Sequence, residues 1–153
     1  MMWKKHSFEF IKAYAGAWVL TYLLACTFHT QRVLYGLNEV GVSIAFADRL
    51  STTLFDYWGL LPVYGPAIAL ALLIAMLVVQ LLSHFIGARV ILGLIGGATA
   101  MAVMLVSMQP IMGVTLIAGA RETTGVALQC LAGASGGLLF AWLYERSAQH
   151  KSV

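Results

Sequence analysis

Charged side chains are scarce in this sequence. Only 10% of its 153 residues are Asp, Glu, Lys or Arg, and 61% are hydrophobic, whereas an average soluble domain has about 25% charged and about 45–50% apolar residues. A chain with so few charges cannot cover a surface that faces water. The composition therefore excludes a soluble globular domain. It predicts an all-α membrane protein whose side chains mostly contact the lipid bilayer.

Residues that could hold a metal or a cofactor are also few. The two cysteines, Cys26 and Cys130, lie in separate apolar runs and form no Cys-x-x-Cys pair, so the motif for disulfide exchange is missing. His29 and His84 fall at opposite membrane sides and cannot bind one haem. The sequence predicts no cofactor, no metal site and no catalytic residues. The run that ends in Cys26 also resembles a bacterial lipoprotein signal, although Leu24 is bulkier than such a signal usually accepts.

Four apolar segments are long enough to cross a bilayer as helices. A helix rises about 1.5 Å per residue, so about 20 apolar residues cross about 30 Å of hydrocarbon. Aromatic residues such as Trp18, Tyr57 and Tyr64 fall mostly near the ends of these segments, where aromatic side chains anchor helices at the membrane interface. We expect the four spans at about residues 10–28, 60–82, 90–108 and 125–144.

The basic residues indicate how the chain is oriented. Nine Lys and Arg residues outnumber six Asp and Glu residues, but they are scattered and form no patch that could bind nucleic acid. With the N-terminus inside, six basic residues lie on the inner side and three, Arg32, Arg49 and Arg121, on the outer side. This distribution follows the positive-inside rule. The sequence therefore predicts a multi-pass protein of a bacterial inner membrane with both termini in the cytoplasm.

The two outer loops contain an apparent internal repeat. Residues 41–52 align without a gap with residues 113–124, at an offset of 72 residues, and the glycine, valine, arginine and final threonine are identical. Each copy follows an outgoing span and precedes a returning one. The alignment predicts two parallel repeats, each a span, a short helix and a second span, about an axis along the membrane normal. Chance similarity between apolar segments is the alternative.

The repeated segments are too short to cross the bilayer. We expect them to form short outer helices at about residues 39–50 and 110–121, which either lie on the membrane surface or enter it as re-entrant helices. In the re-entrant arrangement, Arg49 and Arg121 would face a shared cavity with hydroxyl groups nearby. The candidate pore or loop residues are Asp48, Arg49, Thr52, Arg121, Glu122 and Thr124.

Small residues recur at helical spacing in the expected spans. Gly93 and Gly97 form one Gly-x-x-x-Gly motif in the third span, and Gly133 and Gly137 form another in the fourth. Such residues let membrane helices approach closely. They predict a tight helix bundle and leave open whether the partner helix belongs to the same chain or to a second copy.

Three functions fit these features. The first is a non-catalytic polytopic inner-membrane protein, a subunit or accessory of a membrane complex that contacts other membrane protein subunits or a further copy of itself through its helices. The second is a small passive channel or permease-like protein that transports an anion or small solute between its paired outer loops. The third is a membrane enzyme that acts on lipid at the outer face, for which Asp48, Asp56 and Glu122 are the available acids.

Overall fold

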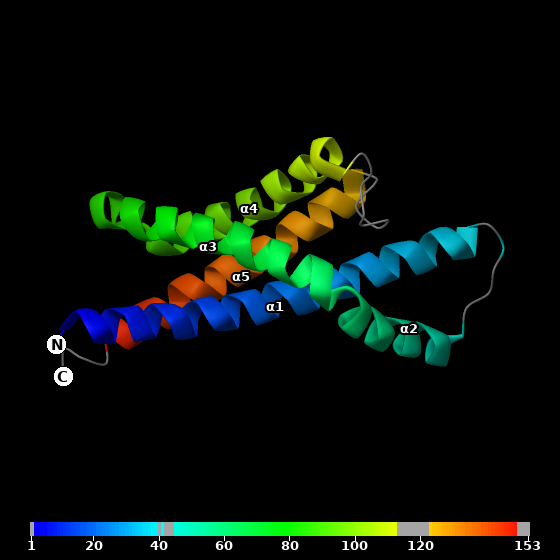
Figure 1. Ribbon diagram of the computed structural model, residues 1–153, viewed down its shortest axis with the longest axis horizontal. Coiled ribbons are helices and arrows are strands. Elements are labelled where there is room, and N and C mark those ends of the chain that lie inside the picture. Colours follow the sequence, from blue (N-terminus) through cyan, green and yellow to red (C-terminus); the bar gives the residue numbers. More distant parts are fainter. Residues whose placement is uncertain (1, 40, 42–44, 113–122, 150–153) are drawn as a thin grey trace.

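The computed structural model describes residues 2–39, 41, 45–112 and 123–149, and this part of the chain forms five α-helices (Figure 1). Four of them, α1, α3, α4 and α5, are long and apolar enough to cross a membrane by length and composition. The expected all-helical fold is therefore confirmed for the described residues, with four helices that could cross a membrane. The helices are α1 (Met2–Glu39), α2 (Phe46–Gly59), α3 (Leu61–Ile86), α4 (Arg89–Met112) and α5 (Thr123–Gln149).

A short turn makes α3 and α4 antiparallel neighbours. Gly87 ends α3 with φ = 72° and donates its N–H to the carbonyl oxygen of Ser83 at 3.1 Å. This left-handed conformation is the common way to end a helix and suits glycine because it has no Cβ. Pro62 lies in the first turn of α3, where its missing N–H leaves no hydrogen bond unmade.

Helix α5 lies between α1 and α4 and packs along both, while α3 packs mainly on α4 and touches α1 (Figure 1). The start of α1, the turn between α3 and α4, and the end of α5 lie at one end of the bundle, and α2 lies at the other. The side chain of Arg89, at the start of α4, stacks on the ring of Tyr144 near the end of α5, 5.0 Å from its centroid. We call the end of the bundle that contains the turn between α3 and α4 the turn end, and the opposite end the α2 end.

The main difference from the expected arrangement is at the α2 end. Helix α1 continues without interruption to Glu39, and the next helix occupies Phe46–Gly59 rather than residues 39–50. No proline interrupts this stretch, and a turn follows only where the N–H of Gly41, with φ = 87°, bonds to the carbonyl oxygen of Asn38. Helix α4 reaches Met112, so most of the other short helix, expected at residues 110–121, lies outside the described residues.

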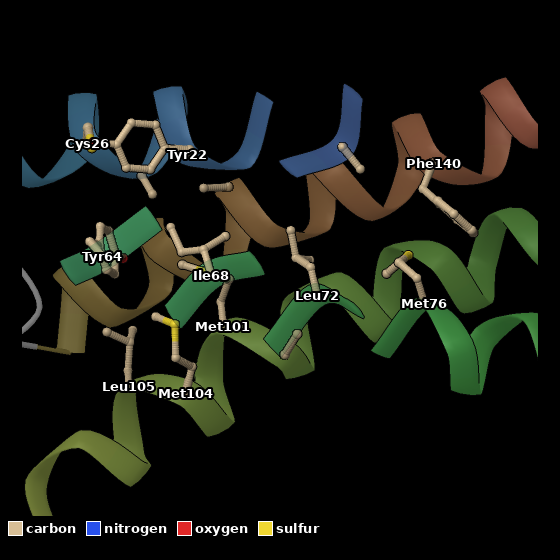
Figure 2. Packing of buried hydrophobic residues seen from close by; sticks show 14 of the residues in the cluster. Tyr22, Cys26, Tyr64, Ile68, Leu72, Met76, Met101, Met104, Leu105 and Phe140 are labelled. Carbon is tan, nitrogen blue, oxygen red and sulfur yellow. The ribbon is translucent and has the colours of Figure 1, made fainter. Parts of the chain in front are cut away.

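The core of the bundle is apolar and lies where α3 meets α1, α4 and α5. Tyr64, Ile68, Leu72 and Met76 repeat every four residues along α3 and are all fully buried. Figure 2 shows this row facing side chains of α4 and α5. Four-residue spacing places side chains on one face of a helix, so this face of α3 is fixed toward the other helices and its opposite face points away from the bundle.

Candidate functional site

The predicted loop residues do not gather in one site among the described residues. Asp48 is exposed in the first turn of α2, and Arg49 and Thr52 are partly buried. The hydroxyl of Thr52 donates to the carbonyl oxygen of Asp48 within the same helix at 2.8 Å. Thr124 is exposed in the first turn of α5. Arg121 and Glu122 lie outside the described residues, as do residues 42–44 and most of the second repeat segment, so the internal repeat stays a prediction.

The two Gly-x-x-x-Gly motifs lie against each other between α4 and α5. A Cβ added to Gly93 would lie 2.5 Å from the carbonyl oxygen of Gly137, and a Cβ added to Gly97 would overlap the carbonyl oxygen of Gly133. A contact this close leaves no room for any side chain. The four glycines are therefore used within this chain, and they bring the backbones of α4 and α5 together.

Helix α5 approaches α1 through a further glycine. A Cβ on Gly136 would lie 2.9 Å from the carbonyl oxygen of Ala17 and would overlap the hydroxyl of Thr21. The Thr21 hydroxyl is buried and has no hydrogen-bond partner among the described residues. Gly136 of α5 thus faces α1, whereas Gly133 and Gly137 face α4, so α5 is closely packed on two sides.

Three aromatic residues of α1 connect it to α3 and α2 through backbone carbonyl groups. Tyr14 donates its hydroxyl to the carbonyl oxygen of Ala69 at 2.6 Å, and the Trp18 indole N–H donates to that of Gly65 at 3.0 Å. Tyr22 donates to the carbonyl oxygen of Tyr57 at 2.7 Å. We call Tyr14, Trp18 and Tyr22 the aromatic row. The sequence suggested an interfacial role for Trp18, whereas the structure uses it to hold two helices together.

A buried hydrogen-bond chain joins α3, α5 and α1 in the interior. The hydroxyl of Tyr64 donates to Oε1 of Gln129 at 2.9 Å, and Nε2 of Gln129 donates to the carbonyl oxygen of Ala25 at 3.0 Å. Both side chains are almost completely buried. Leaving polar groups unpaired in an apolar interior is costly. These two hydrogen bonds therefore fix how the three helices are aligned with one another.

A cluster of polar residues lies between α1 and α2. The hydroxyl of Thr30 lies 2.6 Å from Oδ2 of Asp56, and the hydroxyls of Thr27 and Tyr57 are 2.8 Å apart. His29 is buried beside them. The sequence suggested that Asp56 was an external acid, but the structure places it against α1. Among the described residues, no group of three His, Cys, Asp or Glu residues is arranged to hold a metal ion.

Asp48, another acid of the enzyme hypothesis, does not join Asp56. Asp48 lies eight residues earlier on α2, which separates the two by about 12 Å along the helix. Glu122 is outside the described residues. The paired-carboxylate arrangement that general acid–base chemistry would need is therefore not formed by Asp48 and Asp56.

An apolar groove lies between α3 and α4 and has a volume of about 690 Å³. It runs from Val63 and Met108 at the α2 end to Leu82 and Leu92 at the turn end. Its walls include small residues of α3 (Ala67, Ala71 and Ala75). Thr99 and Ser107 are the polar residues that line it. We call this feature the α3–α4 groove.

Comparison with protein-family models, with curated proteins and with solved structures gives no match. The described features are those of a polytopic α-helical membrane protein, with glycine-mediated contacts inside the bundle and one apolar groove on its outer surface.

Proposed function

We propose that this protein is a non-catalytic subunit or accessory of a membrane complex, and that it binds a transmembrane helix of a partner subunit in the α3–α4 groove. The observation that carries this proposal is the length of the groove. Val63 and Leu82 are 19 residues apart on α3, which corresponds to about 28 Å along the helix. The hydrocarbon layer of a bilayer is about 30 Å thick, so the groove accommodates a helix over its full membrane span.

The side chains of the groove favour close approach of a helix. Ala67, Ala71 and Ala75 follow one another every four residues on α3, so they form one strip of small side chains along the groove. Without a large hydrophobic driving force in lipid, membrane helices associate through close packing at such strips. The four glycines of the two Gly-x-x-x-Gly motifs are already in contact with each other, so this alanine strip offers a small-residue surface for another helix.

Two hydroxyl groups distinguish a helix from an acyl chain as the occupant. Thr99 and Ser107 lie eight residues apart on α4 and line the groove. No hydrogen bond joins either hydroxyl to another residue in the part of the chain that the structure describes. An acyl chain offers them no partner, whereas polar side chains of a neighbouring helix do, and such interhelical hydrogen bonds stabilise membrane helix pairs.

The proposed orientation places the turn end of the bundle in the cytoplasm of a bacterial cell. Arg89 begins α4 and Arg146 lies in the last turn of α5, and both are at the turn end with the start of α1. This agrees with an inner-membrane protein whose cytoplasmic side is rich in basic residues. The groove is lined by none of the candidate loop residues, so the channel and the lipid enzyme remain hypotheses from the sequence.

Photocrosslinking in cell membranes tests the proposal. A photoreactive amino acid at Val103, which lines the groove, is expected to crosslink to a transmembrane segment of a different protein. The same group at Val19, an exposed residue of α1 outside the groove, is the control. The substitution Ala71→Phe, which fills the groove, should abolish the crosslink from Val103. The substitution Ala15→Phe, at an exposed position of α1, should leave it unchanged.

The possible results distinguish a partner helix, a second copy of this chain and lipid as the occupant of the α3–α4 groove. Crosslinks from Val103 to lipid alone would overturn the proposal, as would equal loss of the protein crosslink in both phenylalanine variants. A crosslinked product of twice the mass of this chain would show a second copy in the groove and would replace the partner subunit with a homo-oligomer. Identification of one partner helix, with its protein co-purifying in mild detergent unless Ala71→Phe is present, would support the proposal.

A further inference from the structure

Helix α2 turns its polar side toward the protein and its apolar side away from it. Thr53 is its one buried residue, and Arg49, Thr52, Asp56 and Tyr57 around it are partly buried. The exposed side chains on the other side are apolar apart from Asp48 and Ser51, with Phe46 81% and Trp58 79% exposed. We call this exposed surface the α2 apolar face; it consists of Phe46, Leu50, Leu54, Phe55 and Trp58.

The polar groups on the inner side of α2 are satisfied by α1. Asp56 lies against the hydroxyl of Thr30, and Tyr57 contacts Thr27 through its own hydroxyl and Tyr22 through its carbonyl oxygen. On the exposed side, the hydroxyl of Ser51 donates to the carbonyl oxygen of Asp48 within the helix at 3.1 Å. Helix α2 thus satisfies these polar groups without water, as a helix in lipid must.

The orientation of α2 is the reverse of that of a surface helix in water. A surface helix of a soluble protein packs its apolar stripe on the core and exposes its polar side. In α2 the exposed stripe is the apolar one. Because α2 lies alongside α1 rather than across the end of the bundle (Figure 1), its apolar face points sideways, in the direction in which lipid surrounds a membrane bundle.

The hydrogen bonds also give the depth of α2. Gln129 lies six residues after Thr123, the start of α5, and so about 9 Å inside that end of α5. It bonds to Ala25 of α1, and Tyr57 of α2 meets Thr27, only two residues farther along α1. The C-terminal turn of α2 is therefore about 6 Å inside the end of α5. Twelve residues separate Trp58 from Phe46, so the rest of α2 extends about 18 Å outward.

These depths match the outer part of a bilayer. The headgroup layers bring the bilayer from about 30 Å of hydrocarbon to about 40–45 Å in all. The C-terminal half of the α2 apolar face, with Leu54, Phe55 and Trp58, therefore lies at the level of the acyl chains and their boundary, where aromatic side chains are enriched. The charged pair Asp48 and Arg49 lies nearer the outer end of α2, at the level of headgroups and water.

The face also adjoins a helix that could cross a membrane. Helix α3 begins two residues after α2 ends, and Pro62 and Pro66 in its first turns are exposed apolar residues outside the α3–α4 groove. We propose that the α2 apolar face binds the acyl chains and interfacial region of phospholipids. In this arrangement α2 and the end of α1 form a hairpin embedded in the leaflet at the α2 end of the bundle.

Spin-label accessibility in liposomes tests this inference. The protein, with Cys26 and Cys130 replaced by alanine, carries one nitroxide label at a time and is reconstituted into phosphatidylcholine vesicles. The labelled variants are Asp48→Cys, Leu54→Cys and Trp58→Cys, with Leu77→Cys, at an exposed position of α3 outside the groove, as the lipid-facing control. Oxygen concentrates in hydrocarbon and a nickel chelate stays in water. We expect the ratio of oxygen to nickel collisions at Leu54 and Trp58 to be several-fold higher than at Asp48 and close to the ratio at Leu77.

Two results would overturn the inference. A ratio of oxygen to nickel collisions at Leu54 and Trp58 as low as that at Asp48 would show that water surrounds the α2 apolar face. Protection of both labels from oxygen and from nickel, while Leu77 stays accessible to oxygen, would show that a second copy covers the face. A photoreactive amino acid at Leu54 in cell membranes completes the test, because crosslinks to phospholipid support the inference and crosslinks only to another protein contradict it. A variant that fails to reconstitute is replaced by Leu50→Cys or Phe55→Cys, both on the same face.

Discussion

Gly93 and Gly137 bring the backbones of α4 and α5 into direct contact, so that a Cβ on Gly93 would lie 2.5 Å from the carbonyl oxygen of Gly137. The same geometry recurs one turn away at Gly97 and Gly133. The contact is between backbone atoms, which cannot move aside as the end of a flexible side chain can. The bundle therefore depends on the absence of side chains at these positions.

We expect the substitution Gly97→Ala to lower the free energy of unfolding by about 1–3 kcal/mol, which is the usual cost of forcing extra volume into a packed interior. The measurement is unfolding in mixed micelles with a denaturing detergent. The matched control is Gly36→Ala in α1, where an added Cβ meets nothing within 4 Å. Alanine favours a helix over glycine by about 0.5–1 kcal/mol, so the control should be neutral or stabilising. Equal destabilisation by both substitutions would show that the α4–α5 contact is looser than described.

The interior hydrogen bond between Tyr64 and Gln129 should be measurable as a coupling energy. Tyr64→Phe removes the donor and leaves Oε1 of Gln129 without a partner in an apolar interior. In a double-mutant cycle with Gln129→Leu, we expect a coupling between about 0.6 and 1.7 kcal/mol, the average and the maximum found for hydrogen bonds between membrane helices. Strictly additive effects of the two substitutions would contradict the interaction.

The aromatic row should stabilise the attachment of α3 and α2 to α1. Tyr14→Phe and Tyr22→Phe keep the ring and remove only the hydroxyl that donates to a carbonyl oxygen on the facing helix. Each is expected to lower the free energy of unfolding by about 0.5–1.5 kcal/mol. Tyr35→Phe is the control, because Tyr35 is exposed. The substitution keeps the ring, which lies 5.6 Å from the guanidinium carbon of Arg32. A loss as large in the control as in the two variants would argue against a specific role of the row.

The contact between Asp56 and Thr30 should hold α2 against α1. Asp56→Ala removes the carboxyl oxygen that lies 2.6 Å from the Thr30 hydroxyl. The loss of one hydrogen bond, worth about 0.5–1.5 kcal/mol, should speed amide hydrogen exchange of α2 severalfold while α4 and α5 exchange as before. Asp56→Asn retains an acceptor oxygen and should restore most of the protection. If exchange of α2 does not change in the alanine variant, other contacts hold the helix in place.

The spanning helices were predictable because their signal is long and uniform. Runs of about 20 apolar residues require a helix that crosses the bilayer, and Gly87 marks the end of one of them. The close packing of α4 on α5 could not be derived in the same way. The glycine motifs show that some helix approaches α4 closely, but the choice between α5 and a second copy depends on the three-dimensional arrangement.

The α2 end was harder to predict because hydropathy alone does not show which polar residues are shielded. The expected first span ended at residue 28, before His29, whereas α1 continues to Glu39 and Asp56 of α2 contacts Thr30 beside the buried His29. A signal for α2 was present in the four-residue spacing of Phe46, Leu50, Leu54 and Trp58. The α3–α4 groove had no such signal, because its shape follows from how two helices diverge after their turn.

The central position of α5 has a consequence for biosynthesis. Gly136 meets α1 on one side, and Gly133 and Gly137 meet α4 on the other, yet α5 is the last helix of the described chain to leave the ribosome. Proteins are made from the N-terminus at about 5–20 residues per second, so α1 and α4 are complete for several seconds before the element that joins them exists. During that interval the glycine faces of α4 and the Ala17 face of α1 have no partner within the chain. Until α5 is made, α1 and α4 are linked through α3, and the nascent bundle must remain in this incomplete form in the translocation machinery or in lipid.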